Sequence, residues 1–141
     1  MKKTQILFAI GVMMLMSSCA FMQGLPEDGI SCPDAPKCVS SQVSDPRHHV
    51  EPFNFNDELE TAMLRLKQAL LSEKRVTIIT EQATLLRAEV RSLIFRFVDD
   101  VEFTMLPDQG LIHVRSSART GYSDFGVNRR RIERIRELFQ E

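Results

Sequence analysis

Apolar residues recur at helical spacing in two segments, one near the middle of the chain and one at its C-terminal end. Residues 56–72 and the segment from about Asn128 onward each carry apolar positions three and four residues apart, which predicts a helix that buries one face. These positions are Leu59, Met63, Leu66 and Leu70 in the first segment and Ile132, Ile135, Leu138 and Phe139 in the second.

Four short segments between these helices have the β-branched composition or the alternation that is typical of strands. They cover residues 75–80, 85–92, 94–105 and 111–117. Because short turns join consecutive strands, we expect an antiparallel meander with both helices packed on one face. The predicted fold class is α+β, in the order α-β-β-β-β-α, and an irregular leader precedes it.

The third predicted strand carries charge inside an otherwise apolar pattern, which is costly unless the charge is paired or used. Alternation places Asp99 on the apolar face and Asp100 with Glu102 on the opposite face. The apolar residues of that face are Phe95, Phe97, Val101 and Phe103. A bulge at the two aspartates is the alternative, and it would turn Asp99 outward. Asp99 and Asp100 are therefore not expected to form one catalytic pair.

The N-terminal residues have the features of an export signal. Lys2 and Lys3 precede an apolar run over residues 6–16, which is too short to span a bilayer. The segment Leu15-Met16-Ser17-Ser18-Cys19 resembles a bacterial lipobox, which implies that residues 1–18 are a lipoprotein signal peptide and that Cys19 is lipidated. A plain secretory signal with an incidental cysteine is the alternative.

The resemblance to lipoproteins also implies a location. Ala20 follows the cysteine instead of an aspartate, and the sorting pattern of such lipoproteins then implies the outer membrane, facing the periplasm. Residues 19–30 contain Gly and Pro without periodicity, which predicts a flexible tether. Residues 31–141 are then expected to form a single domain, with the membrane as a partner through the N-terminal lipid.

Two cysteines remain once Cys19 is assigned to lipid. Cys32 and Cys38 are close in sequence, and an exported compartment permits disulfides, so we expect a bond that staples the leader. A zinc site with His48 and His49 is the alternative, but the chain has neither a second cysteine pair nor two histidines at ligand spacing. We therefore predict no metal and no cofactor.

The overall charge argues against a nucleic-acid partner. The formal net charge is −1, and residues beyond Lys2 and Lys3 are more acidic still. Tryptophan is absent and Tyr122 is the single tyrosine, so the chain has few rings on which bases or sugars could stack. An envelope protein or a small anionic ligand is the expected partner.

Several motifs of the chain resemble a bacterial and plant family known as domain of unknown function 1499. The resemblance covers residues 32 to about 138. It rests on Cys32-Pro33-Asp34, Cys38-Val39-Ser40-Ser41, Phe97-Val98-Asp99-Asp100-Val101-Glu102-Phe103, Val114-Arg115-Ser116, Arg119, Gly121-Tyr122-Ser123-Asp124, Gly126-Val127-Asn128 and Arg131-Ile132. The family name assigns no activity, so the resemblance implies a fold and a set of residues.

The charged residues of this set allow two interpretations. A structural network would fix strand register and dock the loop before the last helix; its members are Asp99, Asp100, Glu102, Tyr122, Asp124, Asn128 and Arg131. An anion-binding or enzymatic site would instead use bidentate guanidinium contacts; its members are Arg115, Ser116, Ser117 and Arg119. The arginine run 129–131 either touches anionic lipid headgroups or forms a solvated face with one buried partner.

Catalytic motifs are missing from the sequence. The chain has no Gly-x-Ser-x-Gly elbow, no glycine-rich phosphate loop and no metal-binding helix motif, so a hydrolase is the least favoured class and catalytic residues stay unassigned. We therefore expect a non-enzymatic, lipid-anchored envelope protein that binds a partner or has a structural role. A small-anion or enzymatic site on the Arg/Asp-rich sheet face is the alternative.

Overall fold

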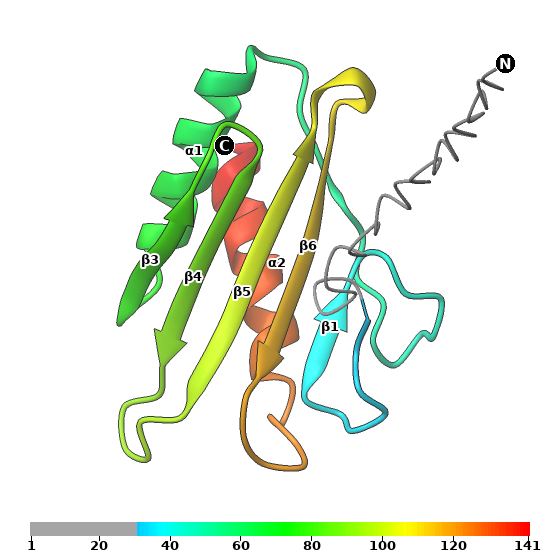
Figure 1. The fold of residues 1–141 in the computed structure, drawn as a ribbon, viewed down its shortest axis with the longest axis vertical. Helices are drawn as coiled ribbons and strands as arrows, with labels where there is room; N and C mark the ends of the chain where they lie inside the picture. Colours follow the sequence, from blue (N-terminus) through cyan, green and yellow to red (C-terminus); the bar gives the residue numbers. More distant parts are fainter. Residues whose placement is uncertain (1–30) are drawn as a thin grey trace, which may run out of the picture.

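The computed structural model describes residues 31–141, and the predicted signal peptide, the lipidation site Cys19 and the tether lie outside these residues. Figure 1 shows one twisted sheet with two helices on the same face. The elements common to the prediction are α1 (Leu59–Leu71), β3 (Val76–Glu81), β4 (Leu85–Arg91), β5 (Val98–Leu106), β6 (Leu111–Ala118) and α2 (Val127–Gln140). Strands β3 to β6 pair antiparallel in sequence order, so the α+β meander with two helices is confirmed.

The leader differs from the irregular segment that the sequence suggested. Two short strands, β1 (Cys38–Ser40) and β2 (Phe53–Asn54), both pair antiparallel with β6 and extend the sheet to six strands. Strands of three and two residues are too short for alternation to reveal them. Their partner lies far along the chain, so only the folded sheet brings the segments together.

Arginines of α2 hold the leader against the domain. Arg129 donates to the carbonyl oxygen of His49 at 2.7 Å, and Arg136 donates to the carbonyl oxygens of Pro52 and Glu51 at 2.8 and 2.6 Å. These contacts satisfy backbone acceptors that no strand partner reaches. The predicted arginine run is therefore partly used to fix the leader.

The third strand starts later than expected. Strand β5 begins at Val98. Residues 92–97 form a loop in which Arg96 adopts a left-handed backbone conformation, with a φ of 53°. Phe95 and Phe97 are exposed there, so the expectation that they share the core face with Asp99 is wrong. Their apolar character continues the strand pattern in the sequence, but the chain needs these residues to reverse direction between β4 and β5. No bulge interrupts the pairing of Val90 with Asp99.

The core lies between the sheet and the two helices. Three phenylalanines from separate elements meet there: the ring centroid of Phe53 lies 5.7 Å from that of Phe103 and 5.8 Å from that of Phe139. Leu66 of α1 and Ile132 of α2 are also fully buried. Because Phe53 comes from β2, the leader supplies part of the core.

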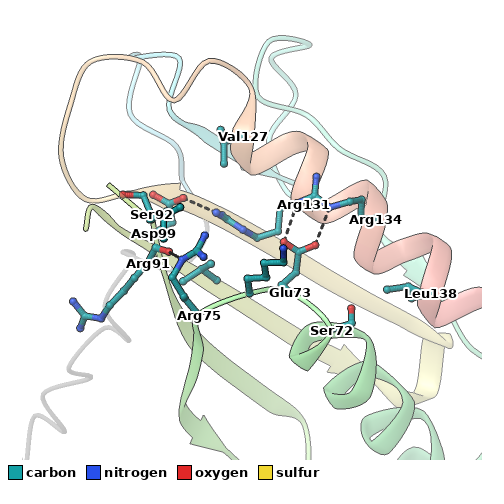
Figure 2. Close-up of a pocket in the computed structure, with 13 residues that line it drawn as sticks. Ser72, Glu73, Arg75, Arg91, Ser92, Asp99, Val127, Arg131, Arg134 and Leu138 are labelled. Atoms are coloured by element: carbon teal, nitrogen blue, oxygen red, sulfur yellow. Dashed lines mark hydrogen bonds and ion pairs between the residues drawn. The ribbon is translucent and has the colours of Figure 1, made fainter. Parts of the chain in front are cut away.

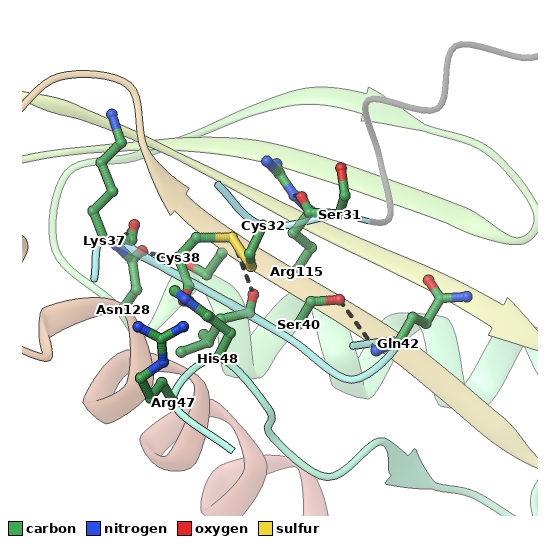
Figure 3. Close-up of a disulfide and its surroundings, with 12 residues drawn as sticks. Ser31, Cys32, Lys37, Cys38, Ser40, Gln42, Arg47, His48, Arg115 and Asn128 are labelled. Atoms are coloured by element: carbon green, nitrogen blue, oxygen red, sulfur yellow. Dashed lines mark hydrogen bonds between the residues drawn. A yellow bond between two sulfur atoms is a disulfide. The ribbon is translucent and has the colours of Figure 1, made fainter. Parts of the chain in front are cut away.

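The predicted disulfide is present in the structure. Cys32 and Cys38 are bonded, with their Cα atoms 5.5 Å apart, and the bond ties the start of the described chain to β1 (Figure 3). On the neighbouring strand β6, Arg115 donates from Nε to the carbonyl oxygen of Ser31 at 2.9 Å. The staple therefore lies against the solvent face of the sheet.

We predict that Phe53→Ala lowers the free energy of unfolding by about 3–5 kcal/mol, because it opens a cavity in the core. Urea denaturation followed by circular dichroism measures this change. The control is Leu64→Ala on the exposed side of α1, which should change stability by less than about 0.5 kcal/mol. Equal effects would mean that the leader does not contribute to the core.

Candidate functional site

A buried ion pair connects the charged strand to the last helix. Asp99 lies on the helix-covered face of β5, and its Oδ2 accepts a hydrogen bond from Nη2 of Arg131 on α2 at 2.7 Å. The exposed fractions of the two side chains are 13% and 5%. Charges so poorly hydrated are tolerated because they neutralise each other.

Polar groups extend this pair to the start of α2. Nη1 of Arg131 donates to Oδ1 of Asn128 at 2.6 Å, and the hydroxyl of Ser116 donates to the same oxygen. The Asp124 carboxylate accepts hydrogen bonds from the backbone N–H groups of Gly126 and Asn128, both at 2.9 Å. Four of the predicted network residues, with Ser116, therefore dock the loop and orient the first turn of α2.

The other two acidic residues of the strand point away from the helices. Asp100 accepts a bidentate contact from Arg119 at 2.7 and 2.8 Å, and Glu102 accepts from Arg87 at 2.5 Å. Arg119 also donates to Glu89 at 2.6 Å, and these hydrogen bonds raise the pKa of its guanidinium. Tyr122, the remaining residue of the predicted network, is exposed.

The four residues of the predicted anion site lie on both faces of the sheet. Ser116 faces the helices, whereas Arg115 and Ser117 lie on the opposite side of β6. Arg119 follows the strand and is engaged by two carboxylates. The structure thus places Ser116 on a different face from the other three, and anion binding by these residues stays a prediction.

A cleft opens beside the buried ion pair. Its volume of about 590 Å³ is within the range typical of ligand sites. It lies between the α1–β3 turn, the end of β4 with the residues that follow it, and α2 (Figure 2). The lining residues are Ser72, Glu73, Lys74, Arg75, Val90, Arg91, Ser92, Leu93, Asp99, Val127, Arg131, Arg134 and Leu138.

Both carboxylates of the cleft are already used. Glu73 accepts from Nε and Nη2 of Arg134, each at 2.8 Å, and this contact raises the pKa of Arg134. Asp99 is held by Arg131. The cleft therefore offers no acidic group that is free of an arginine.

Two basic side chains of the cleft have no carboxylate partner among the described residues. Among residues 31–141, neither Lys74 nor Arg75 forms an ion pair; Arg75 donates from Nε to the carbonyl oxygen of Arg91 at 2.8 Å. Arg91 itself pairs with Glu89 outside the cleft. Figure 2 shows Arg75 and Arg131 reaching toward the same corner near Asp99 from the α1–β3 turn and from α2. The cleft therefore carries an excess of positive charge.

Two further features mark this corner. Nε of Arg131 is buried and has no hydrogen-bond partner in the described part of the chain, which is unusual for a buried donor. Arg75 has a φ of 59°, a backbone conformation that costs energy in a residue other than glycine. An unsatisfied donor and a strained cation therefore lie in one small site.

One of the two histidines of the leader, His48, contacts the backbone of β1. His48 is buried, and its Nδ1 lies 2.9 Å from the carbonyl oxygen of Cys38, which fixes the leader beside β1. Both Cys32 and Cys38 are in the disulfide, so neither offers a thiolate to a metal. Across residues 31–141, no three His, Cys, Asp or Glu side chains are grouped to hold a metal ion.

Sequence reasoning missed the cleft because its members come from distant segments. Glu73, Lys74 and Arg75 belong to the α1–β3 turn, and Arg134 lies near the middle of α2. The one local signal was the run of three charged residues at the change from a helix pattern to a strand pattern, with Arg75 as the first residue of the predicted strand. Their approach to Asp99 depends on how α2 crosses the sheet.

The fold and the cleft define a small single-sheet α+β domain with a cationic hollow at one end. A family model described as "Protein of unknown function (DUF1499)" matches residues 30–139, and the chain belongs to this family. A comparison with curated proteins finds no match. Neither described helix is long and apolar enough to cross a bilayer.

We predict that Asp99→Asn lowers the free energy of unfolding by about 3–5 kcal/mol, because Arg131 then stays buried without a counter-charge. Denaturant unfolding measures this loss. The matched control is Asp100→Asn on the exposed face, which should cost at most about 1 kcal/mol. Similar costs for the two variants would contradict the distinction between a buried and an exposed pair.

Proposed function

We propose that this protein is a non-enzymatic binding module, anchored to the outer membrane through lipid at Cys19, and that it binds a small anion in the cleft beside Arg131. The observation that carries the proposal is the charge of the cleft. Lys74 and Arg75 have no carboxylate partner among the described residues, whereas both acidic side chains of the cleft are occupied by arginines.

The chemistry of these side chains suits a phosphate or carboxylate group. A lysine ammonium is a compact point charge, and a guanidinium presents several donors in one plane. Arg131 lines the cleft as well, and its buried Nε has no hydrogen-bond partner among residues 31–141. An oxyanion that entered the cleft would neutralise charge that the protein leaves uncompensated.

The same cleft is poorly equipped for catalysis. Its two hydroxyl groups have local partners, since Ser72 donates to the carbonyl oxygen of Ala69 at 2.6 Å and Ser92 accepts from the N–H of Phe97 at 2.9 Å. No histidine or cysteine lines the cleft, and each carboxylate is held by an arginine. Binding without chemical conversion is therefore the function that these residues support.

The proposed location rests on the N-terminal signal. The basic residues, the short apolar run and the lipobox-like segment favour export and lipidation. The Cys32–Cys38 disulfide supports an oxidising compartment, because such bonds are rare in the cytosol. An anion, or an anionic group of an envelope protein, would then meet the cleft in the periplasm.

We predict that inorganic phosphate binds the full chain and that Lys74→Gln/Arg75→Gln weakens this binding by at least about tenfold, because a hydrogen bond to a charged group contributes about 1.5–3 kcal/mol. Isothermal titration at constant ionic strength measures the affinity. The control Arg87→Gln removes an arginine of similar exposure that lies outside the cleft.

The control variant should keep the wild-type affinity for phosphate. If the double variant binds phosphate as tightly as the wild type, the cleft is not the site. If the wild type binds none of phosphate, acetate or sulfate, the anion function is wrong.

We predict that cells grown with labelled palmitate incorporate the label into the wild-type chain but not into Cys19→Ala. A Cys38→Ala chain should keep the label, because its loss removes only the disulfide. Gel electrophoresis of the purified chain measures incorporation. Label retained in Cys19→Ala would contradict lipidation at this residue.

A further inference from the structure

Large apolar side chains project into solvent at one end of the sheet. They come from the loop between β4 and β5 and from the loop between β6 and α2, and their exposed fractions range from 49% to 86%. We call this group the apolar tip; its members are Leu93, Ile94, Phe95, Phe97, Tyr122 and Phe125. Both loops lie at the same end of the molecule (Figure 1).

Strand pairing keeps the two loops together. Asp99 pairs with Ala118 at the ends of β5 and β6, and the N–H of Arg119 donates to the carbonyl oxygen of Val98 at 3.0 Å. The loops therefore leave the sheet from neighbouring strands. Their exposed apolar side chains therefore lie at the same end of the sheet.

The first loop is held in a shape that presents its side chains. Ser92 and Phe97 close it with two hydrogen bonds of 2.9 Å, one between backbone groups and one from the N–H of Phe97 to the serine hydroxyl. The rings of Phe95 and Phe97 stack with centroids 5.4 Å apart. The two rings thus shield each other only in part, and water still contacts both.

Two arginines without an ion pair lie beside the apolar tip, and the one carboxylate in its loops, Asp124, accepts hydrogen bonds from the N–H groups of Gly126 and Asn128. Arg96 lies between the two phenylalanines, and Arg130 donates to the carbonyl oxygen of Phe125 at 2.9 Å. Neither forms an ion pair in the described chain, and the same holds for Lys74 and Arg75 of the adjacent cleft. The nearby acids Asp100 and Glu89 are engaged by Arg119.

We infer that the apolar tip inserts into the interface of a bilayer that contains anionic phospholipid. The free energy falls when exposed aromatic and aliphatic side chains leave water for the acyl boundary of a bilayer. Anionic headgroups attract the basic rim, which consists of Arg96 and Arg130. A protein partner would need acidic groups around an apolar socket, whereas a lipid surface supplies both at any orientation about its normal. Leu93 belongs to both the cleft and the tip, so insertion would bring the cleft to headgroup level.

The absence of tryptophan from the chain allows a direct test. A full-length Phe95→Trp chain carries its only indole in the apolar tip, and a full-length Leu64→Trp chain carries it on the exposed side of α1. Each is added to vesicles of phosphatidylglycerol and brominated phosphatidylcholine in equal parts. Any binding through the N-terminal segment affects both chains alike, so a difference in tryptophan emission reports the tip.

We expect the emission of Phe95→Trp to shift to shorter wavelength and to be quenched by the bromines, while Leu64→Trp keeps its emission. Quenching at position 95 should fall in vesicles of brominated phosphatidylcholine alone, because the basic rim then has no anionic lipid to bind. Both results together support the inference.

Four outcomes would overturn the inference. Position 95 is not quenched in the anionic vesicles, or it is quenched no more than position 64. Alternatively, quenching is the same with and without phosphatidylglycerol, which removes the role of the basic rim. A blue shift that appears without vesicles and grows with protein concentration would assign the tip to self-association instead.

Discussion

The buried contact between Asp99 and Arg131 is the interaction on which the arrangement of the charged residues depends. It joins the start of β5 to the N-terminal half of α2, with the exposed fraction of Arg131 at only 5%. Asn128 and Ser116 share the same guanidinium, so the pair also fixes β6 against the helix. A strand that carried Asp99 without Arg131 would bury an unpaired carboxylate, which is why the density of charge in this strand belongs to the scaffold.

Other carboxylates of the sheet and of the cleft are paired with arginines as well. Arg119 neutralises Asp100 on the solvent face, and Arg134 neutralises Glu73 at the edge of the cleft. Lys74 and Arg75 are left without a carboxylate in the described chain, and the apolar loops project beside them. The end of the sheet is therefore cationic and apolar at the same time, which fits a module that meets anions close to a lipid surface.

Local patterns were sufficient to predict most of this fold. The two helices, the meander and the Cys32–Cys38 bond follow from periodicity, turn residues and cysteine spacing, and alternation correctly separated Asp99 from Asp100. Strands β1 and β2 could not be predicted, since their few residues acquire strand geometry only through β6. The cleft was missed for a related reason, because its side chains come from a turn, a strand end and a helix that no sequence spacing brings together.

The central claim is that an anion binds at Arg75 of the cleft and not at Arg119, which the sequence emphasised and which two carboxylates already hold. Nitrogen-15 spectra of the arginine Nε–H groups, recorded while phosphate is added to the folded chain, test this residue by residue. We expect the Arg75 resonance to shift and saturate, while that of Arg119, held by two carboxylates, stays in place. Movement of the Arg119 resonance with an unchanged Arg75 resonance would contradict the account.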